Sequence, residues 1–229
     1  MSALLPDGRP LAPMIDHTLL KPDSRRAQIE KLCDEARQFG FASVCVLPVW
    51  LAVVAERLEG SPVKPCTVVG FPLGGTAPEI KAREADYALK EGAREIDMVA
   101  AIWAIKDGKF RALASDIAAV VRTCTNRAIV KVILETCLLT DEEKVTACKI
   151  AVDSGAHFVK TSTGLSTGGA TVKDVKLLRL IAGETVGVKA SGGIRTFDQA
   201  RAMIEAGANR IGTSAGVEIV GSESSPAPT

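Results

Sequence analysis

The sequence is poor in the features that mark membrane, secreted and nucleic-acid-binding proteins. It has only two histidines, one tyrosine and two tryptophans, and no apolar stretch approaches the roughly 20 residues that cross a bilayer. Its first residues contain an early aspartate and three prolines instead of a basic segment followed by a long apolar one. We therefore expect a soluble chain with no membrane partner.

Runs of like charge are also absent. Lysine and arginine number 28 and aspartate and glutamate 27, a balance that leaves no electrostatic footprint for nucleic acid. The expected partner is therefore a small molecule. The six cysteines form no CxxC pair, which favours a reduced, cytoplasmic protein. They are Cys33, Cys45, Cys66, Cys124, Cys137 and Cys148.

What the chain does contain is a regular alternation of two patterns. Eight short apolar, β-branched runs lie at 14–20, 42–48, 66–72, 95–101, 129–135, 157–162, 186–191 and 210–215. Stretches with apolar residues at every third or fourth position separate them, at 24–40, 77–92, 141–155, 171–183 and 196–207. Eight strands alternating with helices predict an α/β protein built as a single (β/α)₈ TIM barrel. A doubly wound open sheet is the alternative.

Three helix-to-strand junctions repeat the same chemistry and mark a repeated unit. "EGAREIDMV", "SGAHFVKTS" and "AGANRIGTS" each end a helix at glycine, namely Gly92, Gly155 and Gly207. Glycine ends a helix readily because it tolerates positive φ. No linker interrupts the pattern, so residues 1–216 are expected to form one catalytic barrel and residues 217–229 a disordered tail.

In such a barrel the active site lies at the carboxyl ends of the strands. Polar residues at those ends are therefore candidates for function, whereas those at the other end are structural. This criterion selects Asp16, Cys45, Asp97, Lys131, Glu135, Lys160 and Lys189.

Two of these residues, Lys160 and Lys189, end apolar runs at matching depth in consecutive strands. Neighbouring strands lie about 4.8 Å apart, so the two amines are expected within interaction distance. Each would disfavour the charge of the other, and the apolar wall would disfavour both. A lysine that loses its proton is a nucleophile toward carbonyl groups and forms a Schiff base. The pair therefore indicates aldolase chemistry, although its spacing does not say which lysine reacts.

The remaining polar candidates have ordinary readings beside functional ones. Asp97 suits a proton shuttle, a cap for the following helix or a salt bridge to Lys131. Asp16 suits a helix cap or a counter-ion, and Cys45 is by default a free buried thiol. These three residues and Lys131 are expected to support the site.

Glycines near the last two strands predict a phosphate site, because this is where barrels commonly hold phosphate with backbone N–H groups. The candidates are Gly192, Gly193, Gly212, Thr213 and Ser214. A zinc-dependent aldolase would need clustered histidines, yet His17 and His157 are far apart with no close-spaced partner. We expect no metal, and an ordinary hydrogen bond for His157.

With these residues assembled, the sequence resembles the deoxyribose-phosphate aldolase family. The likeness covers roughly residues 14–216 and runs in order through "IDHTLLKP", "SVCVLP", "VVGFPLG", "EIDMV", "VKVILET", "FVKTSTG", "VKASGGIRT" and "RIGTSAG". It implies cleavage of 2-deoxy-D-ribose 5-phosphate to D-glyceraldehyde 3-phosphate and acetaldehyde, in deoxynucleoside breakdown. It also implies a cytoplasmic homo-oligomer, either a dimer or a tetramer, that needs no cofactor.

The resemblance also ranks the candidate residues. It implies that Lys160 forms the Schiff base, that Lys189 lowers the pKa of Lys160 and assists proton transfer, and that Asp97 is the general acid/base. Cys45 would lie beside the site without an essential role. The implied phosphate cradle consists of Gly164, Gly192, Gly193, Gly212 and Ser214.

Two positions depart from the family pattern. Some members have a lysine after the "KTSTG" glycine, where this chain has Leu165, so Arg195 is a candidate to replace that phosphate contact. Some end in a tyrosine credited with proton transfer, whereas the sole tyrosine here is Tyr87, in a predicted helix. Three alternatives stay open: a transaldolase-like Schiff-base aldolase, a catalytically silent sugar-phosphate-binding barrel and a phosphosugar isomerase.

Overall fold

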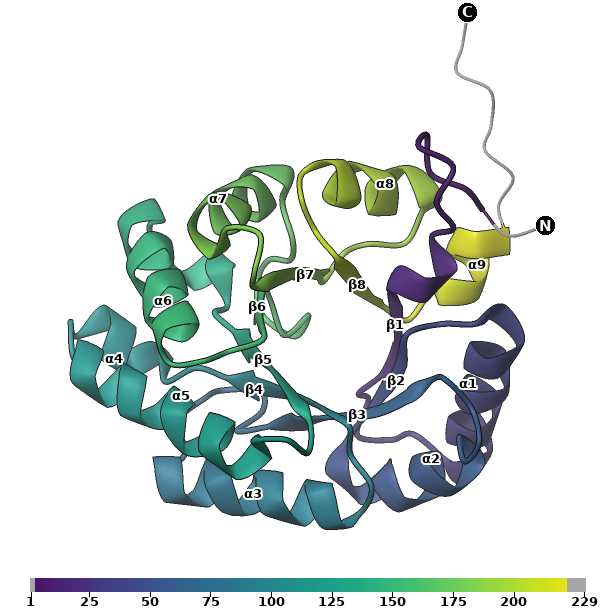
Figure 1. The fold of residues 1–229 in the computed structure, drawn as a ribbon, viewed down its shortest axis with the longest axis horizontal. Coiled ribbons are helices and arrows are strands. Elements are labelled where there is room, and N and C mark those ends of the chain that lie inside the picture. Colours follow the sequence, from purple (N-terminus) through teal and green to yellow (C-terminus); the bar gives the residue numbers. More distant parts are fainter. Residues whose placement is uncertain (1–2, 222–229) are drawn as a thin grey trace, which may run out of the picture.

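Eight parallel strands follow one another around a closed barrel in the computed structural model, which describes residues 3–221 (Figure 1). The barrel closes where β1 pairs with β8. The predicted barrel is confirmed, and the open doubly wound sheet is wrong. The strands are β1 (Ile15–Leu19), β2 (Ser43–Val46), β3 (Lys64–Val69), β4 (Glu95–Val99), β5 (Ile129–Ile133), β6 (Phe158–Lys160), β7 (Gly187–Ser191) and β8 (Arg210–Thr213).

Helices surround the barrel and cover the outward faces of its strands (Figure 1). The five predicted helices are α1 (Arg26–Phe39), α3 (Pro78–Lys90), α6 (Asp141–Asp153), α7 (Val172–Ala182) and α8 (Phe197–Glu205). The structure adds α2 (Leu51–Arg57), α4 (Ile102–Lys106), α5 (Phe110–Cys124) and α9 (Gly216–Gly221), with 3₁₀ turns η1 (Ala12–Met14), η2 (Pro48–Trp50) and η3 (Thr136–Leu138). None of the helices within residues 3–221 has the length and apolarity that a membrane span requires.

Local sequence signals set the ends of several helices. Thr140 accepts a hydrogen bond from the backbone of Glu143, whose side chain in turn accepts from the Thr140 N–H, and this capping box starts α6. The three junction glycines all have positive φ, between 86° and 110°, as the repeated pattern predicted. These short connections turn the chain directly from each helix into the next strand.

The predicted start of the tail is wrong for residues 217–221. They belong to α9, where Ile219 and Val220 are buried against the rest of the barrel. The apolar pair "IV" anchors this last turn of helix. The small and polar residues that follow it led to a predicted tail that begins too early in the sequence. Residues 222–229, the rest of the predicted tail, lie outside the described residues.

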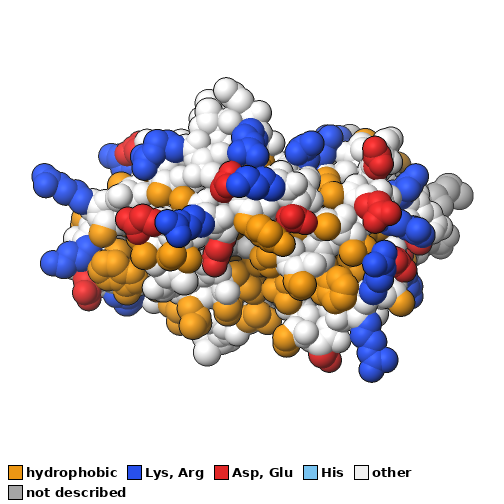
Figure 2. Space-filling view, turned by 90° about the horizontal axis from the view of Figure 1, so that it is seen from below, with side chains coloured by type: hydrophobic (Ala, Val, Ile, Leu, Met, Phe, Trp, Pro, Cys, Tyr) orange, Lys and Arg blue, Asp and Glu red, His pale blue; other side chains and the backbone are white. Residues whose placement is uncertain are grey.

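Charged and apolar side chains share the outer surface. On the side formed by α2 and α3, which lie at the bottom of Figure 1, hydrophobic side chains gather toward the lower edge of the view and charged ones lie above them (Figure 2). Ile80 and Tyr87 of α3 are large hydrophobic residues with about half of their surface exposed, at 45% and 52%. This face therefore offers apolar surface for contact with another protein.

An ion pair is buried between α3 and α5. The Lys81 ammonium lies 2.7 Å from an Asp116 carboxylate oxygen and also donates to the Val99 carbonyl at 2.8 Å. The same Asp116 oxygen accepts the Ala101 N–H at 3.1 Å. Burial raises the pKa of Asp116 and lowers the pKa of Lys81, so each charge depends on its partner. The pair thus ties two helices to the carboxyl end of β4.

Removing one member of this pair should destabilise the fold. Asp116→Ala leaves a buried ammonium without its counter-ion, so we expect the free energy of unfolding to fall by about 3 kcal/mol in urea titrations. The double variant Lys81→Met/Asp116→Leu should recover most of that loss, because no buried charge is left. Lys90→Met, which breaks an exposed pair with Asp86, serves as control and should change stability by under about 0.5 kcal/mol. A loss below about 1 kcal/mol in Asp116→Ala would contradict the proposed role of the pair.

Candidate active site

Four charged side chains from four consecutive strands point into the barrel. Strand register places Asp97 of β4 opposite Lys131 of β5, and Lys160 of β6 opposite Lys189 of β7. All four are almost completely buried. The predicted matching depth of the two lysines is therefore confirmed, and the barrel brings Asp97 to them.

Asp97 is the centre of this group. Its Oδ2 accepts hydrogen bonds from Lys160 Nζ and Lys189 Nζ, both at 2.8 Å. Its Oδ1 accepts from Lys131 Nζ at 2.8 Å and from the Cys66 thiol at 3.4 Å. One carboxylate thus binds three ammonium groups. The predicted salt bridge to Lys131 is present, and the alternative of a helix cap has no support.

A second set of ion pairs surrounds the first. Asp16 pairs with Lys189 at 2.5 Å and also with Arg210, and Lys131 pairs with Glu95 at 2.5 Å. Arg210 closes the ring by pairing with Glu95 at 3.0 Å. Within residues 3–221 the network joins four cations to three carboxylates. The cations are Lys131, Lys160, Lys189 and Arg210, and the carboxylates are Asp16, Glu95 and Asp97.

These contacts decide which groups stay charged. Burial alone would raise the pKa of Asp97, but the surrounding lysines outweigh it and hold that pKa well below its usual value. The pKa of Asp16 is lowered in the same way, by Lys189 above all. Burial would lower the pKa of Lys189, yet Asp16 and Asp97 raise it. The expectation that both lysines lose charge is therefore wrong for Lys189, because it did not count two carboxylates.

Only one of the two lysines is accessible from a pocket of about 310 Å³. Lys160 lines this pocket, whereas Lys189 lies beneath it, fully buried and not among the lining residues. A molecule entering from the carboxyl ends of the strands therefore meets the Lys160 amine first. The structure supplies the distinction that strand spacing alone could not make.

Every residue predicted for the phosphate cradle lines the same pocket. These residues are Gly164, Gly192, Gly193, Gly212 and Ser214, and Thr213 accompanies them. Gly164, Gly192 and Gly193 have φ values of 85°, 88° and 81°, a conformation that side chains with a Cβ rarely adopt. At Gly212 a Cβ would approach Ser191 Oγ to 2.3 Å, so close packing requires glycine there. Lys21 and Arg195 also reach this pocket.

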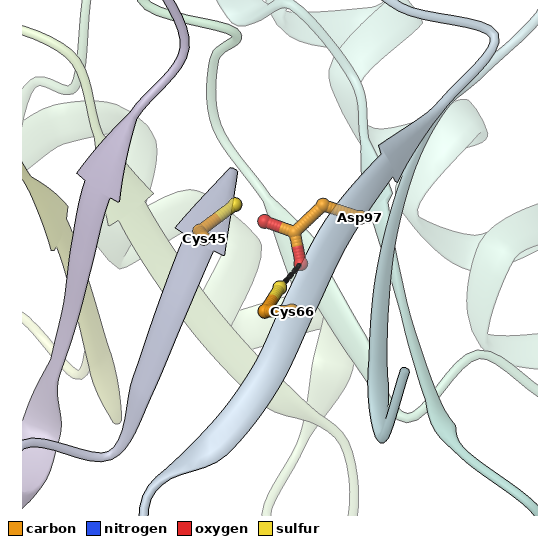
Figure 3. A group of neighbouring side chains, drawn as sticks. All are labelled: Cys45, Cys66 and Asp97. Carbon is orange, nitrogen blue, oxygen red and sulfur yellow. Dashed lines mark hydrogen bonds between the residues drawn. The ribbon is translucent and has the colours of Figure 1, made fainter. Parts of the chain in front are cut away.

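Two cysteines lie beside Asp97. Cys45 of β2 and Cys66 of β3 are register partners, and their thiols and an Asp97 oxygen all lie within 4.8 Å of one another (Figure 3). Donors of these types bind soft divalent metals. However, three ammonium groups already bond to the Asp97 oxygens, and a metal ion there would face their repulsion. The arrangement therefore suits a proton network better than a metal centre.

The two histidines lie outside this network. His17 Nε2 lies 2.8 Å from a Glu35 oxygen and the His17 ring packs against Phe41. His157 Nδ1 accepts the Val130 N–H at 3.0 Å, which is the ordinary hydrogen bond that the sequence predicted. Neither histidine lines the pocket beside Lys160.

Sequence reasoning missed four residues of the site: Cys66, Glu95, Arg210 and Lys21. Glu95 and Arg210 each precede an inward-facing position by two residues in their strands, and side chains two apart share a face. That alternation could have found them. Lys21, after the first strand, could have been found because it stands in the loop position that barrels use for binding.

Comparison with known proteins gives one consistent picture. Residues 11–221 match the sequence pattern of the DeoC/LacD family aldolases. The chain is 60% identical to the deoxyribose-phosphate aldolase of Geobacillus sp. (strain WCH70), over 92% of this chain and 94% of that protein. It is 56% identical to the deoxyribose-phosphate aldolase of Halalkalibacterium halodurans, over 95% and 98%. The tetrameric deoxyribose phosphate aldolase from Aeropyrum pernix superposes with a TM-score of 0.85 at 36% identity, over 91% and 88%.

The buried carboxylates should make the fold sensitive to acid. Because the folded-state pKa of Asp16 lies below the unfolded value of 3.8, its stabilisation is present above about pH 4 and is lost as pH falls further. Urea titrations between pH 5 and 2 should show a steep loss below about pH 4, and Asp16→Asn should flatten it by up to about 1.4 kcal/mol per pH unit. Asp198→Asn, at an exposed pair with Arg201, should leave the slope unchanged. Equal slopes in all three proteins would refute this account.

Proposed function

Because this chain belongs to the DeoC/LacD family of aldolases, we propose that it cleaves 2-deoxy-D-ribose 5-phosphate reversibly to D-glyceraldehyde 3-phosphate and acetaldehyde. The observation that carries the chemistry is the position of Lys160, a buried lysine that faces a pocket and is bonded to a carboxylate shared with a second ammonium group. The names of the relatives favour this reaction over the three alternatives, which are a transaldolase-like enzyme, a catalytically silent barrel and a phosphosugar isomerase.

The charge balance of the network supports Lys160 as the nucleophile. With four cations and three carboxylates, loss of one proton leaves the group neutral. Lys160 is the lysine of the network from which that proton can pass into the pocket. The free amine then adds to C1 of the open-chain sugar and, with loss of water, forms an iminium ion.

Carbon–carbon cleavage follows from the iminium. A base removes the proton of the 3-hydroxyl group, the C2–C3 bonding electrons move to C2, and an enamine and D-glyceraldehyde 3-phosphate result. The enamine is protonated at C2, and water hydrolyses the new iminium to acetaldehyde and the free Lys160 amine.

Asp97 and Lys189 are suited to move those protons. Asp97 remains a carboxylate because the lysines outweigh its burial and lower its pKa, so it accepts hydrogen bonds from both amines, and we assign it the general acid/base role together with Lys189. Its Oδ2 bonds to both Lys160 and Lys189, which gives a proton a direct path between the two amines. We assign proton transfer to Asp97 working with Lys189 or an ordered water, and supporting electrostatic roles to Asp16 and Lys131.

Binding of the phosphate falls to the glycine-rich turns and two cations. The residue after Gly164 is Leu165, which is 61% exposed and offers no charge. Lys21 and Arg195 reach the same pocket, and no ion pair to an acidic side chain holds either one within residues 3–221. They are therefore free to neutralise a phosphate, and we assign this role to both.

Assembly and location complete the proposal. A homo-oligomer, dimer or tetramer, is supported by the tetrameric relative from Aeropyrum pernix and by the apolar surface around Ile80 and Tyr87. A cytoplasmic location is supported by the six cysteines, all of which are free thiols in the structure. No nucleic-acid partner is proposed.

Reductive trapping tests the covalent step. Borohydride added together with 2-deoxyribose 5-phosphate should leave an ethyl group on Lys160, identified by peptide mass spectrometry. Lys160→Ala should lose activity by at least about 10³-fold and take up no ethyl group. Protein treated without sugar is the control. An adduct on Lys189 would reverse the lysine roles, and no adduct at saturating sugar phosphate would overturn the Schiff-base mechanism.

Charge removal at the pocket mouth tests phosphate binding. Lys21→Met and Arg195→Met should each raise the KM for 2-deoxyribose 5-phosphate about tenfold and leave kcat nearly unchanged, because the lost contact is made equally to substrate and transition state. Lys173→Met changes an exposed lysine of α7 that pairs with Asp141 and should not alter KM. If both pocket variants match the wild type, the phosphate is held by backbone groups alone.

A further inference from the structure

Glu135 has an unusual conformation at the edge of the active site. It follows β5 directly, and its φ and ψ are 56° and 63°, in the left-handed region that disfavours residues other than glycine. Within residues 3–221 only Asn126 shares a positive φ among non-glycine residues. Glu135 is also 2% exposed, so a carboxylate is buried here in a strained backbone. Strained backbone of this kind persists only where surrounding contacts impose it, and it is concentrated at functional sites.

The carboxylate of Glu135 bonds to the loop that follows β6. The Thr163 N–H donates to both carboxylate oxygens at 3.3 Å, and the Thr163 hydroxyl donates to Oε2 at 2.5 Å. The Thr163 Oγ1 in turn accepts the Leu165 N–H at 3.1 Å. Glu135 therefore engages the N–H of Thr163 directly and that of Leu165 through the threonine hydroxyl.

Gly164 lies between these two engaged groups. Within the described residues its own N–H makes no hydrogen bond, and the residue lines the pocket beside Lys160. The other side of the loop is fixed to β7, because Thr161 donates its N–H to the Lys189 carbonyl and its hydroxyl to the Ser191 carbonyl. The loop is thus held on both sides, and the unbonded N–H of Gly164 belongs to a residue that lines the pocket.

We propose that Glu135 is a positioning residue that sets the β6–α7 loop for recognition of the substrate's phosphate. The Glu135 oxygens accept hydrogen bonds from the Thr163 N–H and hydroxyl, so this carboxylate is directed at the loop that carries Gly164. Glu135 does not touch the reacting atoms, because both of its oxygens bond to the loop. This inference rests on the proposed function, which supplies the phosphate-bearing substrate.

The test compares a phosphorylated and an unphosphorylated substrate. Glu135→Gly removes the carboxylate and suits the positive φ, so it should fold, and Glu135→Gln keeps the length but loses one acceptor. In Glu135→Gly we expect the KM for 2-deoxyribose 5-phosphate to rise about tenfold with kcat within about twofold, and a smaller rise in Glu135→Gln. The kcat/KM for 2-deoxyribose should change less than about twofold.

Glu143→Gln is the matched control, because it makes the same change of charge at a helix cap that does not touch the loop. Equal losses on both sugars in the Glu135 variants would overturn the inference, as would unchanged KM values. Calorimetric titration with inorganic phosphate provides a separate readout: the dissociation constant should rise about tenfold in Glu135→Gly and stay constant in Glu143→Gln. A wild type that cleaves neither sugar would refute the proposed function, while the titration would still decide the role of Glu135.

Discussion

The arrangement of the site depends on one carboxylate that is shared by three buried ammonium groups. Asp97 holds Lys131 from one side and Lys160 and Lys189 from the other, each at 2.8 Å. Without it, three ammonium groups would lie in the buried barrel interior with only Asp16 and Glu95 to balance their charge, and Lys160 would have no carboxylate partner. Asp97 thus makes the lysines compatible with folding, and the network as a whole holds one cation more than it has carboxylates.

The barrel supplies this arrangement through strand register. Parallel strands in consecutive order put residues of similar depth side by side, so Asp97 and Lys131 are paired across β4 and β5, and Lys160 and Lys189 across β6 and β7. Alternation within each strand then places Glu95 one layer below Asp97. A layer of ion pairs below Asp97 holds Lys131 and Lys189, so that Lys160 is the lysine of the network that faces the pocket.

Much of this could be predicted from the sequence, and the limits have physical causes. Apolar runs and helical periodicity are local, so the eight strands and five of the helices could be found, whereas short α2 and α4 give too few turns for a periodic signal. Lys160, Lys189 and Asp97 stood out because a charge in an apolar strand is conspicuous. The charge state of Lys189 could not be predicted, because it depends on Asp16, which is 173 residues away and reaches it only when the barrel closes.

The sequence marks Glu135 as a candidate but predicts no role for it. Its position at a strand end marks it as polar in the right place, but its function depends on a backbone torsion and on Thr163, 28 residues later. A positive φ at a glutamate has no signature in composition or spacing. The residues proposed to bond to the substrate lie in recognisable motifs such as "KTSTG", whereas a residue that holds such a motif in place is found only from contacts between loops. The residues proposed to react can therefore be found from local sequence patterns, whereas the residue proposed to position the loop can be found only from long-range contacts.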